Sequence, residues 1–244
     1  MLKAVYPNWP APDNIRALTT TRQGGRSTAP YHSLNLASHV GDDLNHIIEN
    51  RMLVKQSEGL PSEPIWLNQI HSTKVIDLAN YHSVDADGSY SQQKKVISAV
   101  LTADCLPVLF CSQQGDEIAA AHAGWRGLCQ GILENSVRHF KCQPSQIMAW
   151  LGPAIGPLKF EVGAEVKAQF EFYDSEASNA FQLVEQTQQK YLADLYLLAR
   201  QRLTKLGLQH IYGGEHCTYS ESELFYSYRR QSQTGRMASL IWFE

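Results

Sequence analysis

The most constraining feature of this sequence is a series of short apolar runs, each bounded by Gly, Pro, Asp or Asn. Runs of this length that are β-branched or continuously apolar predict buried strands. They cover residues 16–20, 75–77, 96–102, 107–111, 117–122 and 147–151. These segments supply the β part of the fold.

Three other segments carry apolar residues at helical spacing, and they predict helices over residues 44–59, from about Gly127 to Phe140, and 192–206. Gly207 is a natural stop for the last of these helices. The polar segments 83–95 and 175–189 are interpreted as excursions from one domain. The mixture predicts an α/β (α+β) fold, with residues 1–244 forming a single compact, layered domain of mixed sheet.

Composition and charge exclude several classes of protein. The chain has 244 residues, of which 43% are apolar, so it is not disordered. Its net charge of -3 with scattered Lys and Arg residues argues against a nucleic-acid partner. No apolar run approaches the roughly 20 residues that span a bilayer, so we expect no membrane partner. The start of the chain has no apolar signal-peptide core, and the five cysteines are an odd, widely spaced set. Both observations favour the cytoplasm.

Common catalytic motifs are missing from the sequence. There is no Walker A loop, G-x-G-x-x-G, G-x-S-x-G, C-x-x-C or H-E-x-x-H, and the zinc pattern of nucleoside deaminases is also absent. Any enzymatic chemistry must therefore come from residues that the fold brings together.

Three segments place a candidate ligand at the end of an apolar run beside turn-forming residues. The segments are 66–72, 101–107 and 119–127, and the candidates are His71, Cys105 and His122. Strand ends are where ligands bind in α/β sheets. Because 34 and 17 residues separate the three candidates, only the fold can assemble a joint site.

The residue types leave three interpretations open. The first is that all three side chains are buried for packing, as free cysteines often are. The second is a zinc site with two imidazoles, one thiolate and an open fourth position, which is the stoichiometry of a catalytic zinc. In the third, Cys105 is a nucleophile and one histidine is its base.

Candidate anion-binding residues follow the same segments. The sequence after His122 predicts a strand, a glycine turn and a helix start, whose N–H groups and the nearby Arg126 suit phosphate or carboxylate. The alternative is a simple turn with Arg126 solvated. Four arginines lie beside glycines and aromatics and suit a wall that binds phosphate and a base, namely Arg22, Arg229, Arg230 and Arg236. The alternative is that they are surface arginines on loops. The segment 85–88 resembles part of a calcium loop but lacks its later acidic positions, so we interpret it as a turn.

The sequence resembles the laccase-domain proteins, formerly called multicopper polyphenol oxidases and now associated with purine nucleoside phosphorylase and adenosine deaminase activity. The similarity extends over nearly the whole chain and is most specific from Thr102 to Gly127. Its motifs are Thr-Thr-Thr-Arg-Gln-Gly-Gly from residue 19, Asn-Gln-Ile-His from 68, Thr-Ala-Asp-Cys-Leu-Pro from 102, His-Ala-Gly-Trp-Arg-Gly from 122, Leu-Gly-Pro-Ala-Ile-Gly from 151, and Thr-Gly-Arg from 234.

This resemblance implies a metal site at His71, Cys105 and His122, and a fold related to bacterial deamidating toxins that use a Cys–His pair. We expect zinc ahead of copper, although these soft ligands would also accept copper. A multicopper oxidase needs many local H-x-H pairs, and none of the nine histidines forms one.

The resemblance also implies a reaction, in which phosphate attacks C1′ of adenosine, inosine or 5′-methylthioadenosine and releases the base. The predicted phosphate partners are Arg22, Arg126 and Arg229, and Asn68 and Gln69 are predicted to read the base or ribose. Adenosine deamination in the same pocket needs an acid/base group, for which we name Asp104. The alternatives are a Cys–His amidase or deamidase, a copper-dependent polyphenol oxidase, and a non-catalytic metal- or purine-binding protein.

Overall fold

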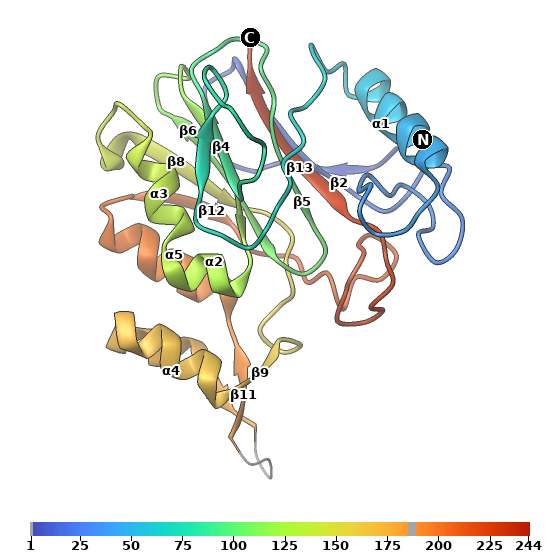
Figure 1. The fold of residues 1–244 in the computed structure, drawn as a ribbon. Coiled ribbons are helices and arrows are strands. Elements are labelled where there is room, and N and C mark those ends of the chain that lie inside the picture. The colour runs from blue at the N-terminus through green and yellow to red at the C-terminus, as the bar shows by residue number, and fades with distance from the viewer. Residues whose placement is uncertain (1, 185–188) are drawn as a thin grey trace.

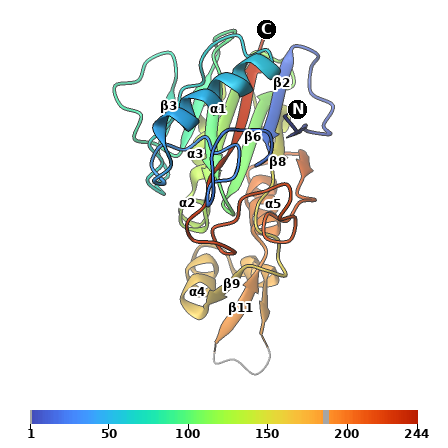
Figure 2. The ribbon, with the colours of Figure 1, turned by 90° about the vertical axis from the view of Figure 1, so that its right-hand side faces the viewer.

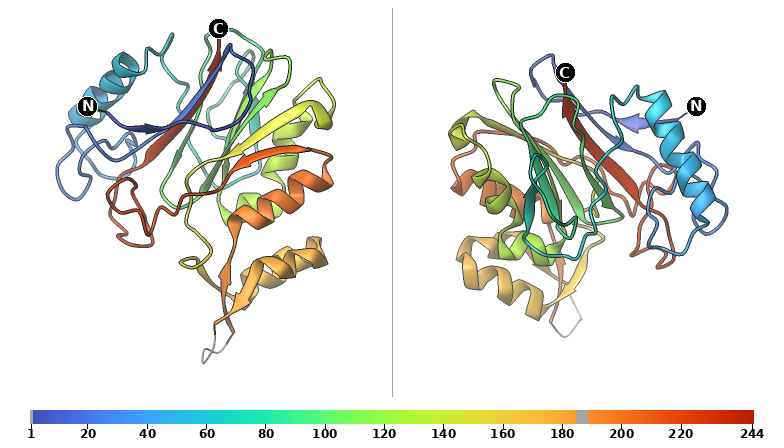
Figure 3. Two further views of the ribbon diagram at one scale, coloured as in Figure 1. Left: turned by 180° about the vertical axis from the view of Figure 1, so that it is seen from behind. Right: turned by 45° about the horizontal axis from the view of Figure 1, so that its top comes forward.

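The chain folds into four layers, in which two sheets pack face to face and helices cover their outer faces (Figure 1). This computed structural model describes residues 2–184 and 189–244. Seen from behind, α1 (Leu44–Ser57) and α5 (Leu195–Lys205) lie on opposite sides of the sheets (Figure 3). The mixed α/β fold in a single domain confirms the fold class predicted from the sequence.

The smaller of the two packed sheets has four antiparallel strands. Their order is β1 (Ala4–Val5), β2 (Ile15–Thr20), β13 (Met237–Phe243) and β5 (Ser98–Thr102). Helix α1 covers its outer face, where Leu18, Leu240 and Val54 share one core cluster. The last strand of the chain is thus an interior strand of this sheet.

The larger sheet has six strands and mixed direction, because its two outer pairs are parallel and the central pairs are antiparallel. Its order is β12 (His210–Gly213), β8 (Ile147–Leu151), β6 (Leu106–Ser112), β7 (Ile118–Ala123), β4 (Gly88–Ser91) and β3 (Val75–Asp77). Helices α2 (Trp125–Gln130), α3 (Ile132–Arg138) and α5 pack on its outer face.

Strand β6 is almost entirely apolar because both of its faces are buried. In β6, Leu106 and Val108 point toward the helices, whereas Leu109 points toward the four-stranded sheet. Successive strand residues face opposite sides, so apolar residues on both sides of β6 fill two different cores.

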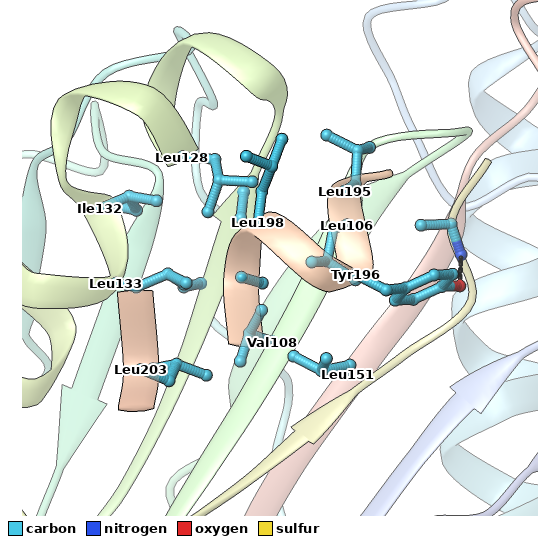
Figure 4. Close-up of a cluster of buried hydrophobic side chains, with 14 of the residues drawn as sticks. Leu106, Val108, Leu128, Ile132, Leu133, Leu151, Leu195, Tyr196, Leu198 and Leu203 are labelled. Carbon is cyan, nitrogen blue, oxygen red and sulfur yellow. Dashed lines mark hydrogen bonds between the residues drawn. The ribbon is translucent and has the colours of Figure 1, made fainter. Parts of the chain in front are cut away.

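The packing beneath α5 shows how the outer helices are fixed (Figure 4). Leu198 and Leu203 of α5 lie among Leu133 of α3 and Val108 of β6 in one buried cluster. The hydroxyl of Tyr196 accepts a hydrogen bond from the backbone N–H of Ala154 at 2.8 Å. This bond ties the helix to the loop that follows β8.

A smaller group of elements projects from one end of the molecule (Figures 1 and 2). It contains β9 (Glu161–Gly163), α4 (Ala164–Tyr173), the 3-10 helix η2 (Ser175–Ala180), β10 (Phe181–Leu183) and β11 (Lys190–Ala193). The three strands form their own antiparallel sheet. The polar segment 175–189 contributes η2 and β10 to this group, and its residues 185–188 lie outside the described part of the chain.

Three sequence expectations need correction. The helix expected from Gly127 to Phe140 is two helices, because Gly131 has a positive φ of 108°. The helix expected from Leu192 begins at Leu195, since Leu192 pairs in β11 and Asp194 caps the helix. The segment 83–95 is not only an excursion, because β4 within it is fully buried in the six-stranded sheet. Within residues 2–184 and 189–244, no helix is long and apolar enough to cross a bilayer.

Candidate active site

His71, Cys105 and His122 meet at one end of the strands of the six-stranded sheet. Their ligand atoms all lie within 4.8 Å of one another. His122 is near the carboxyl end of β7, Cys105 is in the turn between β5 and β6, and His71 is in the loop before β3. The two imidazole rings meet edge to face, with 4.9 Å between centroids. The fold therefore assembles the three residues that were singled out from separate strand ends.

Gly124 leaves the space that this cluster needs. A Cβ atom at Gly124 would lie 3.0 Å from the Cys105 sulfur, 3.2 Å from the His71 ring and 3.6 Å from Nε2 of His122. The backbone φ of Gly124 is -60°, which any residue can adopt, so the requirement for glycine is spatial. A Cβ would fill the space between the three donor groups.

Asp87 is the buried residue that orients both histidines. Its carboxylate accepts five hydrogen bonds, from the backbone N–H groups of residues 70, 71 and 72, from the Ser72 hydroxyl and from Nδ1 of His122. The bond from Nδ1 of His122, at 2.8 Å, leaves Nε2 of that ring to face the cluster. The bonds to residues 70–72 hold His71 in a left-handed conformation with φ 60°.

The electrostatics of the cluster favour a thiolate beside an imidazolium. Burial alone would raise the pKa of Cys105, but the facing His122 and His71 rings outweigh it, so the pKa is lowered. Burial alone would lower the pKa of His122, but Cys105 and Asp87 outweigh it, so the pKa is raised. Burial opposes ionisation of Asp87, yet hydrogen bonds from His122 and Ser72 lower its pKa to about 2. A deprotonated thiol is the form that either binds a metal or attacks a substrate.

A cavity of about 460 Å³ opens above the cluster. Its lining includes His71, Cys105 and His122 together with Phe160, Tyr228, Arg229, Arg236 and His39. This volume is within the usual range for small-molecule sites. The cavity thus combines three side chains of the kinds that bind metals, two guanidinium groups and two aromatic rings.

The predicted phosphate partners lie in three different places. Arg229 lines the cavity, with its guanidinium over the Phe160 ring. Arg22 lines a separate pocket, where its guanidinium donates to the carbonyl oxygens of His32 and Ser222. Arg126 is exposed, lies over the Trp125 ring and is not among the residues that line the cavity.

The other predicted residues are partly engaged in holding the backbone. Gln69 lines the cavity, but its amide exchanges hydrogen bonds with the backbone of Leu101. Asn68 is exposed and donates to Asp85. The carboxylate of Asp104 lines the cavity and accepts from Thr218, Ser227 and the backbone N–H of Arg229.

Sequence reasoning missed Asp87 and His39 as site residues, and it named Arg236 only as one of four arginines of a binding wall. Asp87 belongs to the segment that was interpreted only as a turn, and its burial directly before β4 becomes visible only in the fold. Arg236 follows Gly235 in a motif that was noted only for the resemblance and for the general wall of arginines. His39 begins a His-Val-Gly-Asp-Asp motif that belongs to the family resemblance, but more than 30 residues separate it from His71, so the sequence alone does not place it beside the cluster.

The fold and the site define a class of protein: a mixed α/β domain with two histidines and one cysteine clustered beneath a cavity of small-molecule size. The family model described as "Multi-copper polyphenol oxidoreductase laccase" matches residues 16–244. The chain belongs to this family, which confirms the resemblance seen in the sequence.

Individual relatives match over almost the whole chain. A Haemophilus influenzae protein named purine nucleoside phosphorylase is 52% identical over 244 residues, with full coverage of both chains. The Escherichia coli protein named purine nucleoside phosphorylase YfiH is 53% identical, with 99% of each chain covered. The crystal structure of Neisseria meningitidis protein NMB0706 superposes with a TM-score of 0.93 at 48% identity, covering 99% of each chain.

Proposed function

We propose that this protein is a purine nucleoside phosphorylase with adenosine deaminase activity at the same site. The names of its relatives supply the reaction class. The observation that carries the proposal is a single cavity that holds the His–Cys–His cluster and two guanidinium groups. Phosphorolysis needs an anion site beside the sugar and stabilisation of charge on the departing base.

The cluster fits a zinc ion. Two imidazoles and a thiolate match catalytic zinc stoichiometry, and the orientation of His122 by Asp87 is the usual carboxylate support for a histidine ligand. His71, Cys105 and His122 would hold the ion. Bound zinc would supply a Lewis acid for negative charge and would activate water for deamination. The absence of a Cβ at Gly124 is consistent with a group placed between these three side chains.

In the proposed reaction, a phosphate oxygen forms a bond to C1′ while the bond from C1′ to N9 of the purine breaks. The electron pair of the broken bond goes to the base, which then takes up a proton, and ribose 1-phosphate is the other product. Arg229 would hold the phosphate, and the Phe160 and Tyr228 rings would give the purine an aromatic wall. The cavity walls would keep bulk water from C1′.

Deamination replaces the 6-amino group of adenosine with oxygen from water and releases ammonia. Asp104 stays our proposed acid/base group, since it lines the cavity next to Cys105. Its carboxylate also holds the segment 227–229 through Ser227 and Arg229, so its substitution would test both roles. The five free thiols support a reducing, cytoplasmic setting for this chemistry.

The direct test combines elemental analysis of the purified protein with an assay of adenosine and inosine, with and without phosphate. We expect about one zinc per chain, phosphate-dependent release of adenine or hypoxanthine, and phosphate-independent conversion of adenosine to inosine. Zinc-containing protein that consumes neither nucleoside would contradict the proposal and favour a metal- or purine-binding protein.

One observation favours a second candidate, a Cys–His amidase. Cys105, His122 and Asp87 have the arrangement of a nucleophile, a base and a carboxylate that orients the base. This candidate predicts a covalent adduct on Cys105 and activity that does not depend on metal.

A further inference from the structure

We propose that Arg236, together with Arg229 and His39, forms a phosphate subsite beside the His–Cys–His cluster. The proposal rests on the proposed function, because it assigns the position of inorganic phosphate and of the phosphate group of ribose 1-phosphate. It replaces the two sequence-predicted partners that do not line the cavity with two residues that do.

The backbone around Arg236 fixes its guanidinium in the cavity wall. Nη1 donates to the carbonyl oxygens of Thr234 and Gly235 at 2.8 and 3.0 Å. The backbone N–H of Arg236 donates to the buried side chain of Asn35 at 3.0 Å. Cζ lies 5.8 Å from the centre of the Tyr228 ring, which also lines the cavity. One side of the guanidinium is therefore anchored before any ligand binds.

The other side of the guanidinium has no partner of opposite charge. Among the described residues, Nε and Nη2 of Arg236 donate no hydrogen bond to the protein, and neither Arg236 nor Arg229 forms an ion pair. Burial lowers the pKa of Arg236, and the charges of Cys105, Asp104, Tyr228 and Tyr31 counteract this effect. Arg236 and Cys105 line the same cavity, so the guanidinium lies in the wall that surrounds the cluster.

The charge balance of the cavity calls for an anion. Asp104 is the acidic residue of the lining, and its two oxygens already accept three hydrogen bonds from Thr218, Ser227 and the N–H of Arg229. Two guanidinium groups thus face the cavity with one carboxylate, which is otherwise engaged. A half-buried cation without a counter-charge is unfavourable, and a bound dianion would compensate both cations.

His39 completes the subsite with a neutral donor. It lines the same cavity, and its pKa is lowered by burial and by the nearby Arg236 and Arg51. A neutral imidazole beside Arg236 can donate one hydrogen bond to a phosphate oxygen. Two planar guanidinium forks and one imidazole suit a tetrahedral anion that offers several acceptor oxygens.

Steady-state kinetics with phosphate and nucleoside varied separately tests the subsite. We expect Arg236→Gln to raise the KM for phosphate about 10- to 100-fold, because charge-assisted hydrogen bonds are lost. Arg236→Lys should give a smaller increase, since it keeps the charge but not the fork. The KM for the nucleoside and the zinc content should stay unchanged. Arg138→Gln removes an exposed guanidinium of α3 outside the cavity and serves as the matched control.

Arg126→Gln provides the discriminating comparison, because the sequence alone placed phosphate at that residue. A rise in the KM for phosphate in Arg126→Gln, with none in Arg236→Gln, would overturn the proposal. A wild-type KM for phosphate in both Arg236 variants would also overturn it, even if the wild-type protein is a phosphorylase.

Binding measurements separate this proposal from the proposed function. Titration of zinc-loaded protein with inorganic phosphate, followed by phosphorus NMR, should show binding that weakens in Arg236→Gln and His39→Asn. If the wild-type protein binds phosphate through Arg236 but does not cleave nucleosides, the subsite stands and the phosphorylase proposal fails. If the protein folds and loads zinc but phosphate binds equally to wild type and Arg236→Gln, the subsite is wrong.

Discussion

Cys105 distinguishes the two candidate chemistries at the scale of one residue. If it is a zinc ligand, Cys105→Ser should lose zinc and activity together by about 100-fold or more, because a hydroxyl is a much poorer ligand than a thiolate. Zinc content and nucleoside turnover, measured on the same preparation, check this expectation. Mass spectrometry of wild-type protein trapped with substrate should show no adduct on Cys105. A covalent intermediate there would remove the phosphorylase mechanism and support the amidase.

A second prediction concerns the effect of Asp87 on zinc affinity. In Asp87→Asn, one carboxylate oxygen becomes an NH2 group that must face either a backbone N–H of residues 70–72 or Nδ1 of His122. The second orientation forces the ring proton onto Nε2, the nitrogen that faces the cluster. We therefore expect zinc affinity to fall about 10- to 100-fold.

A competition titration against a zinc chelator measures this loss. Asp85→Asn is the matched control, because Asp85 lies two residues away, its side chain accepts from the exposed Asn68 and its backbone N–H donates to Ser83. Equal zinc affinities in the two variants would show that the Asp87 carboxylate does not orient the ligands.

The sequence could predict the three cluster residues because each is a reactive side chain at the end of an apolar run. It could not predict Asp87, and it could not select Arg236 from the four arginines of the wall, since both roles depend on distances across the fold. Arg126 illustrates the reverse problem. Its glycine turn and helix start are present, but the helix has six residues and the side chain stacks on its own neighbour, Trp125.

At the scale of elements, the two glycines that flank α2 have different tasks. Gly124 begins the helix with an ordinary φ, so Gly124→Ala should fold normally and lose zinc, because its Cβ would crowd the cluster. Gly131 ends the helix with a φ of 108°, so Gly131→Ala should lower the free energy of unfolding by about 1–2 kcal/mol and keep zinc. Chemical denaturation and metal analysis of both variants check the contrast. Normal zinc binding by Gly124→Ala would show that the space at Gly124 is not required.

The sequence predicted strands correctly where an apolar run was continuous, as in β6 and β8. Strand β4 did not, because its sequence Gly-Ser-Tyr-Ser carries polar groups that only the fold satisfies. Ser89 bonds to the hydroxyl of Ser98, and Tyr90 donates to the buried Glu117. Residues 192–206 show one continuous helical period of apolar residues, which predicted a single helix. Asp194 caps α5, however, so the helix begins at Leu195 and Leu192 belongs to strand β11.

For the whole molecule, acid should destabilise the metal-free protein through Asp87. Its folded pKa of about 2 is below its ordinary value of 3.8, so its stabilisation is present above about pH 4 and is lost as pH falls toward 2. The linked free energy is about 2 kcal/mol. Urea unfolding of wild type and Asp87→Asn should give curves whose difference shrinks by about this amount between about pH 5 and pH 2. A difference that stays constant with pH would mean that the pKa of Asp87 is not shifted.

The position of β13 has a consequence for how the molecule folds. Ser239 of β13 bonds to Thr19 of β2, which precedes it by 220 residues, and the other edge of β13 pairs with β5. Until β13 is in place, the edges of β2 and β5 that it covers are open. Pairings between such distant segments form slowly, and open edges invite pairing with other chains. Partly folded chains in which β13 has not yet paired are therefore expected to be the aggregation-prone form of this protein.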